Sequence, residues 1–527
     1  MPRRNWILAS AVLASGIVFL DSTVVNVALK SIGKELPSTF VGVLEGESYV
    51  VNGYLLTLSA LLILAGKLAD TYGRRRMFLI GLAGFGAVSV LCGLAPTMEL
   101  LIVFRLAQGV FGAILVPTSL AIINATFSGE ERGRAFGVWA AATGVTTIAG
   151  PVLGGYVVDA LSWRVAFLIN PPLVVIALIV ALRMLPESRD PEARGRFDWL
   201  GASAVAVGVG GLTYGAIRGQ QSQWTDVSAF AALGIGAVTT LALVPLMTRR
   251  RDPLIPPSLF RSRNFTVTNI STMLIYGALY TYGQFQAIFL QGALGYSALA
   301  SGLVTVPSSL FLIFLSTQMG SLAGRFGPRL FMTVGPALMG GGLLWLLRLP
   351  SSSPAWEASV TSAGSLVPPL GAVIDLLPAL LVFGLGISIM VAPLTTALMT
   401  SVPPRNSGLA SAINNAVSRI GPLLAWAVIF IGVSAVFYGG LSSRLGMETD
   451  SAVVRAQYPP LNPPDTGSQQ EIQAAREAST DAFHLAMLIA AGLAISGAAI
   501  NGLGIRNPPR QVLERRESEA AGSGGGG

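Results

Sequence analysis

The chain has 527 residues, of which 52% are hydrophobic and only 11% are charged. A soluble globular protein of this length needs a far more charged surface, so the composition excludes one and indicates a protein that crosses the membrane many times. The net charge of +8 would suit nucleic-acid binding, but basic residues gathered at the cytoplasmic ends of membrane helices explain it better, and we expect no nucleic-acid partner.

Fourteen apolar segments follow one another along the chain, most of them near the length of about 20 residues that a helix needs to cross the hydrocarbon core. Lipid-facing backbone must form its hydrogen bonds within its own segment, so we predict helices rather than strands. The predicted fold class is an all-α integral membrane protein with 14 transmembrane helices. The segments lie at roughly 6–29, 49–69, 77–95, 99–124, 135–158, 165–185, 199–217, 227–247, 266–291, 299–322, 330–349, 374–400, 406–438 and 482–505.

Positive charges orient these segments in the membrane. With the N-terminus in the cytoplasm, 22 basic residues fall on the cytoplasmic side and 8 in the outer loops, as the positive-inside rule predicts. An even number of spans then puts both termini in the cytoplasm. Because the composition is rich in Arg and poor in Lys, we favour a bacterial source and expect a multi-pass protein of the bacterial cytoplasmic membrane.

An internal repeat divides the chain into two halves. "GKLADTYGRRRM" at 66–77 is repeated as "GSLAGRFGPRLF" at 320–331, and "RAFGVWAAATGVTTIAGP" at 134–151 as "RNSGLASAINNAVSRIGP" at 405–422. The members of each pair fall on the same side of the membrane, so we predict parallel six-helix repeats that rock about a site near the bilayer midplane.

This repeat predicts the domain organisation. In the outer loop of the second half, "EIQAAREAS" reads as a short surface helix. The predicted parts are an N-terminal six-helix bundle at 1–190, two additional helices (spans 7 and 8) at 191–262, a C-terminal six-helix bundle at 263–505 with an outer loop at 441–480, and a cytoplasmic tail at 506–527 that ends in linker-like glycines.

Five stretches carry a resemblance to a known family. They are "LDSTVVNVAL" in span 1, "GKLADTYGRRR" in loop 2–3, "RLAQGVFGAILVP" in span 4, "GPVLGG" in span 5 and "WRVAFLINPP" before span 6. In this order on fourteen spans, they resemble the major facilitator superfamily, and within it the fourteen-helix drug:proton antiporters. The resemblance covers nearly all of residues 1–505. It implies the major facilitator fold, alternating access, multidrug efflux and antibiotic resistance.

Asp21 places a carboxylate inside the first apolar segment. At mid-span such a charge costs about 2.5–3.5 kcal/mol on insertion scales, so these residues mostly face a cavity or a partner. At 1.5 Å per residue, Asp21 lies about 12 Å below the outer end of span 1 and Arg105 about 9 Å below that of span 4, so the two share a depth. We predict that they form the proton-coupling pair, and the resemblance implies proton transfer for the Arg. The alternatives are a structural, hydrogen-bonded Asp and a static ion pair.

Loop 2–3 carries an acid at the end of span 2 and a basic run before span 3. We predict a gate in which Asp70 pairs with a group of the other half when the cytoplasmic side is shut; the alternative is that these charges only set topology. The sequence departs from the family pattern, because Thr71 stands where a basic residue usually follows the Asp, and the second copy has Gly324 in place of the acid. The predicted gate residues are Asp70, Gly73, Arg74, Arg75 and Arg325.

"GPVLGG" in span 5 combines a proline, which removes a backbone hydrogen bond, with glycines that let a neighbouring helix come close. The resemblance associates this motif with antiporters, and ordinary helix packing is the alternative. The predicted motif residues are Gly150, Pro151, Gly154 and Gly155.

Polar and aromatic residues of several spans form the predicted substrate cavity. Arg419 has two other interpretations, contact with backbone carbonyls or with a lipid phosphate. The sequence has no phosphate-binding loop, metal-ligand spacing or Ser/His/Asp arrangement, so we expect no metal, no cofactor and no enzyme. The predicted cavity residues are Asn26, Gln108, Gln284, Phe285, Asn414 and Arg419.

Scarce charge inside the membrane suits a hydrophobic cargo. The predicted function is a proton-coupled exporter of lipophilic small molecules, with a cationic compound favoured. We expect a monomer whose partners are its substrate, protons and membrane lipids. Two alternatives stay open: a dedicated exporter of a lipid or cell-envelope precursor, and a non-transporting membrane receptor or scaffold.

Overall fold

The structure, a computed structural model, describes residues 3–37, 43–188, 197–222, 226–250, 252–359, 362–446, 448, 452–463 and 467–507. Within these ranges every regular element is helical, as the sequence predicts. The α-helices are α1 (Arg3–Glu35), α2 (Val43–Tyr72), α3 (Arg74–Gly93), α4 (Met98–Thr126), α5 (Gly129–Ala160), α6 (Val165–Leu168), α7 (Asn170–Met184), α8 (Trp199–Gln221), α9 (Val227–Arg249), α10 (Arg263–Gly292), α11 (Ala298–Leu303), α12 (Val306–Phe326), α13 (Arg329–Trp345), α14 (Leu370–Thr400), α15 (Ser407–Leu445), α16 (Ala452–Gln457) and α17 (Gln469–Gly504).

Each predicted apolar segment coincides with one helix or with a short helix followed by a long one. The two interrupted segments are α6–α7 and α11–α12. Helix α7 begins at Asn170 and carries Pro171 and Pro172 in its first turn, and α12 begins at Val306 with Pro307 next. A proline has no N–H for the preceding turn, so it ends one helix and suits the start of another.

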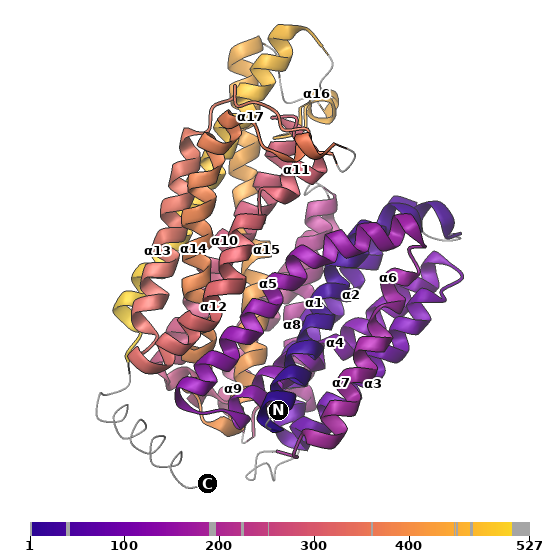
Figure 1. Cartoon of the computed structure of the whole chain (residues 1–527), viewed down its shortest axis with the longest axis vertical. Helices are drawn as coiled ribbons and strands as arrows, with labels where there is room; N and C mark the ends of the chain where they lie inside the picture. The colour runs from indigo at the N-terminus through magenta and orange to yellow at the C-terminus, as the bar shows by residue number, and fades with distance from the viewer. Residues whose placement is uncertain are drawn as a thin grey trace.

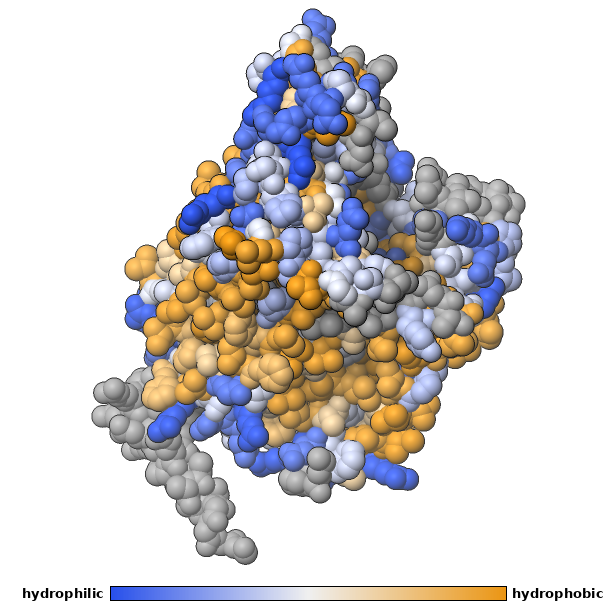
Figure 2. Space-filling view, turned by 45° about the horizontal axis from the view of Figure 1, so that its top comes forward, coloured by the Kyte–Doolittle hydropathy of each residue, from blue (hydrophilic) through white to orange (hydrophobic). Residues whose placement is uncertain are grey.

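Twelve of these helices are long and apolar enough to cross a membrane. Among the described residues, α5 and α10 fall outside that set. In α10, Asn, Thr, Tyr and Gln dilute the apolar residues. A broad apolar belt lies between two hydrophilic ends of the molecule (Figure 2), as a bilayer requires. The chain is therefore a multi-pass membrane protein, and the count of fourteen spans stays a prediction.

The helices form two groups that diverge (Figure 1). In the N-terminal group, α1 contacts α4, α5 and α7; in the C-terminal group, α13 contacts α14 and α17, and α10 contacts α15 and α17. Helices α8 and α9 pair with each other, and α8 lies against α2 and α15. The groups touch through α5 with α12 and α2 with α15. The predicted domain boundaries stay predictions, and the one at 190 lies outside the described residues.

We call the end at which α1 begins and α17 ends the basal end, and the end that carries α16 the distal end (Figure 1). At the basal end, Arg3 Nε donates to the Met184 carbonyl at 2.9 Å, and Arg263 Nε donates to the Gly504 carbonyl at 2.8 Å. Each bond joins the start of the first helix of a group to the end of its last. The two groups thus repeat the same contact, as the sequence repeat predicts. A second repeated contact joins Arg75 to Leu182 and Arg329 to Gly502.

The predicted outer loop at 441–480 is wrong in part, because helices occupy both of its ends. Helix α15 continues to Leu445, and residues 469–480 are the first turns of α17 rather than a separate surface helix. Ser468 and Glu471 start α17 with a capping box. The 36 residues of α17 span about 54 Å, well beyond a hydrocarbon core of about 30 Å, so α15 and α17 project from the distal end. Arg444 joins these extensions through Glu477 and Asp481.

Candidate functional site

Asp21 and Arg105 form an ion pair inside the N-terminal group. Arg105 Nη1 donates to Asp21 Oδ2 at 2.5 Å. The Arg105 side chain is 1% exposed and the Asp21 side chain is 0% exposed. They belong to α4 and α1, which lie in contact. Removing one partner of such a pair leaves an uncompensated buried charge, which costs about 3–5 kcal/mol. The shared depth that the sequence predicts for these residues is therefore realised as a direct contact.

Two side-chain amides complete the surroundings of the carboxylate. Gln108 Nε2 donates to Asp21 Oδ1 at 3.0 Å, and Asn170 Nδ2 donates to the same oxygen at 2.9 Å. Both amides also donate to Ser89 Oγ. With Arg105, the carboxylate has three partners, and all are donors, which suits its ionised form. The buried Asn170 Oδ1 has no hydrogen-bond partner among the described residues, so one acceptor stays unused beside the acid.

Arg105 also has partners other than the acid. Its Nε donates to the Val50 carbonyl at 2.9 Å, its Nη1 to Gln108 Oε1 at 2.7 Å, and its guanidinium lies 4.2 Å from the centre of the Tyr54 ring. Val50 and Tyr54 belong to α2. These contacts do not depend on the charge of Asp21, so they hold the guanidinium independently of the acid.

At the basal end a second buried acid joins the two helix groups. Asp70, at the end of α2, accepts hydrogen bonds from the backbone N–H groups of Gly408 at 3.2 Å and Leu409 at 2.9 Å, in the first turn of α15. Arg74 donates to the same carboxylate at 2.8 Å and to the Pro404 carbonyl. A carboxylate at a helix N-terminus also interacts favourably with the helix dipole. The basal end is closed by this contact.

Backbone contacts between small residues close the rest of the basal end. A Cβ atom at Gly66 would lie 2.5 Å from the Gly408 carbonyl oxygen, and one at Gly320 would collide with the Gly133 carbonyl. These are the α2–α15 and α12–α5 contacts, and the sequence repeat relates one to the other. Gly324, which replaces the acid in the second copy, lies against the backbone of α5. The second contact is therefore made without a buried acid.

The other predicted gate residues lie elsewhere. Gly73 adopts a φ of 110°, which disfavours other residues, and a Cβ there would meet the Glu187 carboxylate at 2.7 Å. Glu187 accepts from the backbone N–H groups of Arg75 and Arg76 at the start of α3. Arg325 is exposed, with its guanidinium 5.3 Å from the centre of the adjacent Phe326 ring.

The "GPVLGG" motif lies where α5 crosses α1. A Cβ at Gly150 would collide with the Thr23 side chain, and one at Gly154 would lie 3.1 Å from the Val24 Cα. Both contacts are two or three residues from Asp21, so α5 follows the backbone of α1 next to the ion pair. The surroundings of Pro151 and of Gly155 lie outside the described side chains.

A cavity of about 400 Å³ lies between the two groups. Of the predicted cavity residues, Asn414 and Arg419 line it. Gln108 belongs to the ion-pair network, and Phe285 is buried and stacked on Trp426 with ring centres 5.8 Å apart. The lining residues are Phe19, Leu120, Trp139, Gly144, Tyr276, Leu279, Tyr280, Tyr282, Gly283, Thr305, Ser308, Ser309, Leu312, Phe383, Ile387, Val391, Leu394, Thr395, Leu398, Asn414, Asn415, Ser418 and Arg419.

Two other predicted residues are not part of this cavity. Asn26 and Gln284 are exposed and absent from its lining.

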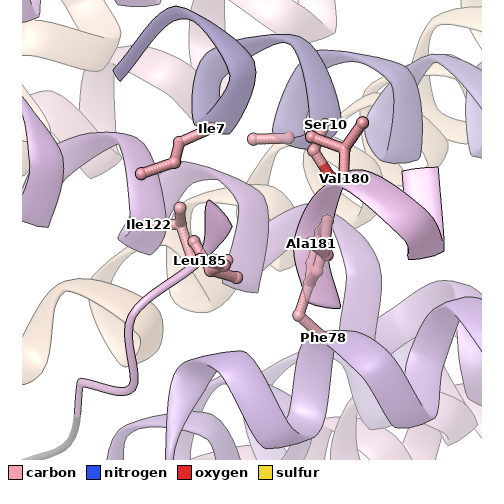
Figure 3. Close-up of a pocket in the computed structure, with 8 residues that line it drawn as sticks. Ile7, Ser10, Phe78, Ile122, Val180, Ala181 and Leu185 are labelled. Carbon is pink, nitrogen blue, oxygen red and sulfur yellow. The ribbon is translucent and has the colours of Figure 1, made fainter. Parts of the chain in front are cut away.

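A separate crevice lies among α1, α3, α4 and α7. Its lining residues are Ile7, Ser10, Ala11, Phe78, Ile122, Val180, Ala181 and Leu185 (Figure 3). It has no room for a water molecule, so it offers no substrate site.

The profile of the Major Facilitator Superfamily matches residues 11–426 of the chain. The chain belongs to this superfamily. Like other major facilitators, it is therefore a membrane transporter rather than an enzyme.

Similar proteins include the multidrug resistance protein Stp of Mycobacterium tuberculosis (strain CDC 1551 / Oshkosh), 34% identical over 83% of this chain and 76% of that protein. Another is a probable actinorhodin transporter of Streptomyces coelicolor, 31% identical over 86% of this chain and 76% of that protein. Among solved structures, the human organic anion transporter MFSD10 superposes with a TM-score of 0.58 over 95% of this chain and all of that chain, at 14% identity. At that identity, the likeness shows the fold alone.

Sequence reasoning missed two members of the ion-pair network of this major facilitator, Asn170 and Ser89. Asn170 stands just before Pro171, at the break between α6 and α7, and this Asn-Pro-Pro sequence was the available signal. Ser89 lies in an ordinary apolar run of α3. No pattern marks it, because its role comes only from the approach of α4 and α7.

Proposed function

We propose that this major facilitator is a proton-coupled exporter of lipophilic small molecules, with Asp21 as the group that gains and loses the proton. The observation that supports this proposal most strongly is the fully buried pair of Asp21 and Arg105 in the membrane interior. A buried acid with only donors around it is stable as a carboxylate and must rearrange its partners when it is protonated.

A side chain next to Asp21 can provide the new partner that the protonated acid needs. A neutral carboxyl has a hydrogen to donate, and rotation of the Asn170 side chain would turn its unpaired Oδ1 toward that hydrogen. Arg105 keeps Val50, Gln108 and Tyr54 as partners. Protonation therefore weakens the tie between α1 and α4: the guanidinium keeps its neutral partners but loses its counter-ion, which favours a rearrangement.

Helix α5 connects the ion pair to the contact between the two groups. Near Asp21, α5 lies against α1 through Gly150 and Gly154. At the basal end the same helix lies against α12 through Gly133 and Gly137. A small shift of α1 that follows protonation is thereby transmitted to the interface that must open for alternating access.

We assign the basal end to the cytoplasm, with both termini there and the chain in a bacterial cytoplasmic membrane as a monomer. The run Arg74–Arg76 and the pair Arg249 and Arg250 at that end support this orientation. In this state the transporter is shut toward the cytoplasm, and Asp70 on the α15 N-terminus is the proposed gate.

The test is transport by the full chain in liposomes with an imposed pH gradient. We expect Asp21→Asn to abolish gradient-driven efflux while substrate exchange without a gradient continues, because the isosteric amide fills the site but cannot titrate. Asp375→Asn is the matched control, since Asp375 bonds Ser353 near the distal end of α14 and lies outside the ion-pair network. Gradient-driven efflux that survives Asp21→Asn removes Asp21 from the coupling role.

A further inference from the structure

Among the described residues that line the central cavity, one has a charged side chain, Arg419 of α15. It is half-buried, and no carboxylate of the described chain forms an ion pair with it. Asn415 lies one turn away on the same helical face, and the adjacent Ser418 also lines the cavity. Asp21 is turned away from the cavity into its own network and does not compensate this charge.

Groups that can donate hydrogen bonds belong to residues that line the same cavity. Three tyrosines of α10, Tyr276, Tyr280 and Tyr282, are among the lining residues. The indole N–H of Trp139, which can only donate, has no partner among the described residues. An isolated cation together with unused donors attracts a ligand that brings acceptors and negative charge.

The rest of the lining is apolar and aromatic. Phe19 and Trp139 meet edge to face with ring centres 6.3 Å apart, and Phe383 lies 4.4 Å from Tyr282. Aromatic faces also attract cations, but that attraction is weaker than the repulsion between an ammonium and a guanidinium in the same low-dielectric cavity. The charges of the cavity therefore oppose the cationic substrate that the sequence favours.

We propose that the cavity binds lipophilic anions, with a carboxylate, sulfonate or phosphate at Arg419 and an aromatic or aliphatic body against the rings of α1, α5 and α14. The proposal rests on the proposed export function and specifies its substrate class. A fatty or phospholipid anion and a soluble aromatic acid share this chemistry.

The test measures equilibrium binding to the detergent-solubilised full chain, without any proton gradient. Energy transfer from tryptophan to a pyrene probe is the readout. The probes are pyrenebutyrate and pyrenebutylamine, which share a body and differ in charge. We expect the anion to bind at least tenfold more tightly, Arg419→Gln to abolish this preference, and Arg419→Lys to keep most of it. Arg348→Gln, which removes an exposed guanidinium outside the cavity, is the matched control.

Equal or tighter binding of the amine, or a preference for the anion that persists in Arg419→Gln, would overturn the proposal. Phosphatidylglycerol added to the micelles identifies the source of the anion: displacement of pyrenebutyrate supports a lipid anion, and no displacement supports a soluble acid. Because binding needs no gradient, an intact anion preference without gradient-driven transport would count against the export function and leave the binding site in place.

Discussion

The contact of Asp70 with the first turn of α15 predicts a specific shift in the balance between transporter states. We consider Asp70→Asn, which keeps the shape of the side chain and removes its charge. In the present state the carboxylate accepts from the N–H groups of Gly408 and Leu409. The amide retains one acceptor and turns its NH₂ group toward the other N–H, so one of these bonds is lost.

The loss has a magnitude that can be worked out. A hydrogen bond to a charged group contributes about 1.5–3 kcal/mol, and the interaction with the helix dipole about 0.3–1 kcal/mol. The ion pair with Arg74 lies within the same group of helices, so it is present in both states and cancels. The basally closed state is therefore destabilised by about 2–4 kcal/mol, which shifts the population by a factor of about 30 to 700.

The assay is electron–electron distance measurement between spin labels at Arg76 and Leu330. Both residues are exposed, at the starts of α3 and α13 in different groups. We expect Asp70→Asn to move the distance distribution from a short, closed-state population to a longer one. The labelled chain without the substitution gives the reference distribution.

Asp198→Asn provides a matched control. Asp198 is also a buried acid that accepts from backbone N–H groups, those of Gly201 and Leu254, and pairs with Arg250, but its partners all belong to the α8–α9 region. This change should leave the distance between the labels unaltered. An unchanged distribution in Asp70→Asn, or an equal shift in both variants, would refute the assignment of a gate to Asp70.

Three other predictions concern the ion pair, the α1–α5 contact and the direction of charge movement. Arg105→Ala should lower thermal stability by about 3–5 kcal/mol, and addition of Asp21→Asn should restore part of it, because the lone buried charge disappears; no recovery in the double variant would contradict this. Gly150→Ala should cost about 1–3 kcal/mol by overpacking against Thr23, whereas Gly234→Ala, with no atom within 4 Å, should cost nothing in the same melting assay. Exchange of a monovalent anion for one proton moves two charges, so a membrane potential of about −100 mV should add about 4.6 kcal/mol of driving force. Transport in vesicles clamped with valinomycin measures this effect. Transport by one-for-one exchange of a cation for a proton should not respond to the potential.

Much of the architecture follows from the sequence alone. Long apolar segments in a polytopic chain must become helices, because the hydrocarbon core leaves backbone groups no other partners. The repeated glycines and arginines of loops 2–3 and 10–11 predict two equivalent halves, and the depth of Asp21 and Arg105 below the membrane surface predicts their meeting. These inferences depend on local spacing and on the bilayer, both of which can be read along the chain.

Other features depend on which helices meet. Ser89 and Asn170 join the ion pair only because α3 and α7 approach α4, and the "EIQAAREAS" stretch continues α17 only because its alanines pack against α15. The charge of the cavity is the clearest case. Asp21 and Arg419 are both ionisable groups in apolar segments, and the fold neutralises the first with Arg105 while it leaves the second facing the cavity. A side chain's partners come from distant parts of the chain, so composition sets how many charges the membrane holds, and tertiary packing decides which of them meets the substrate.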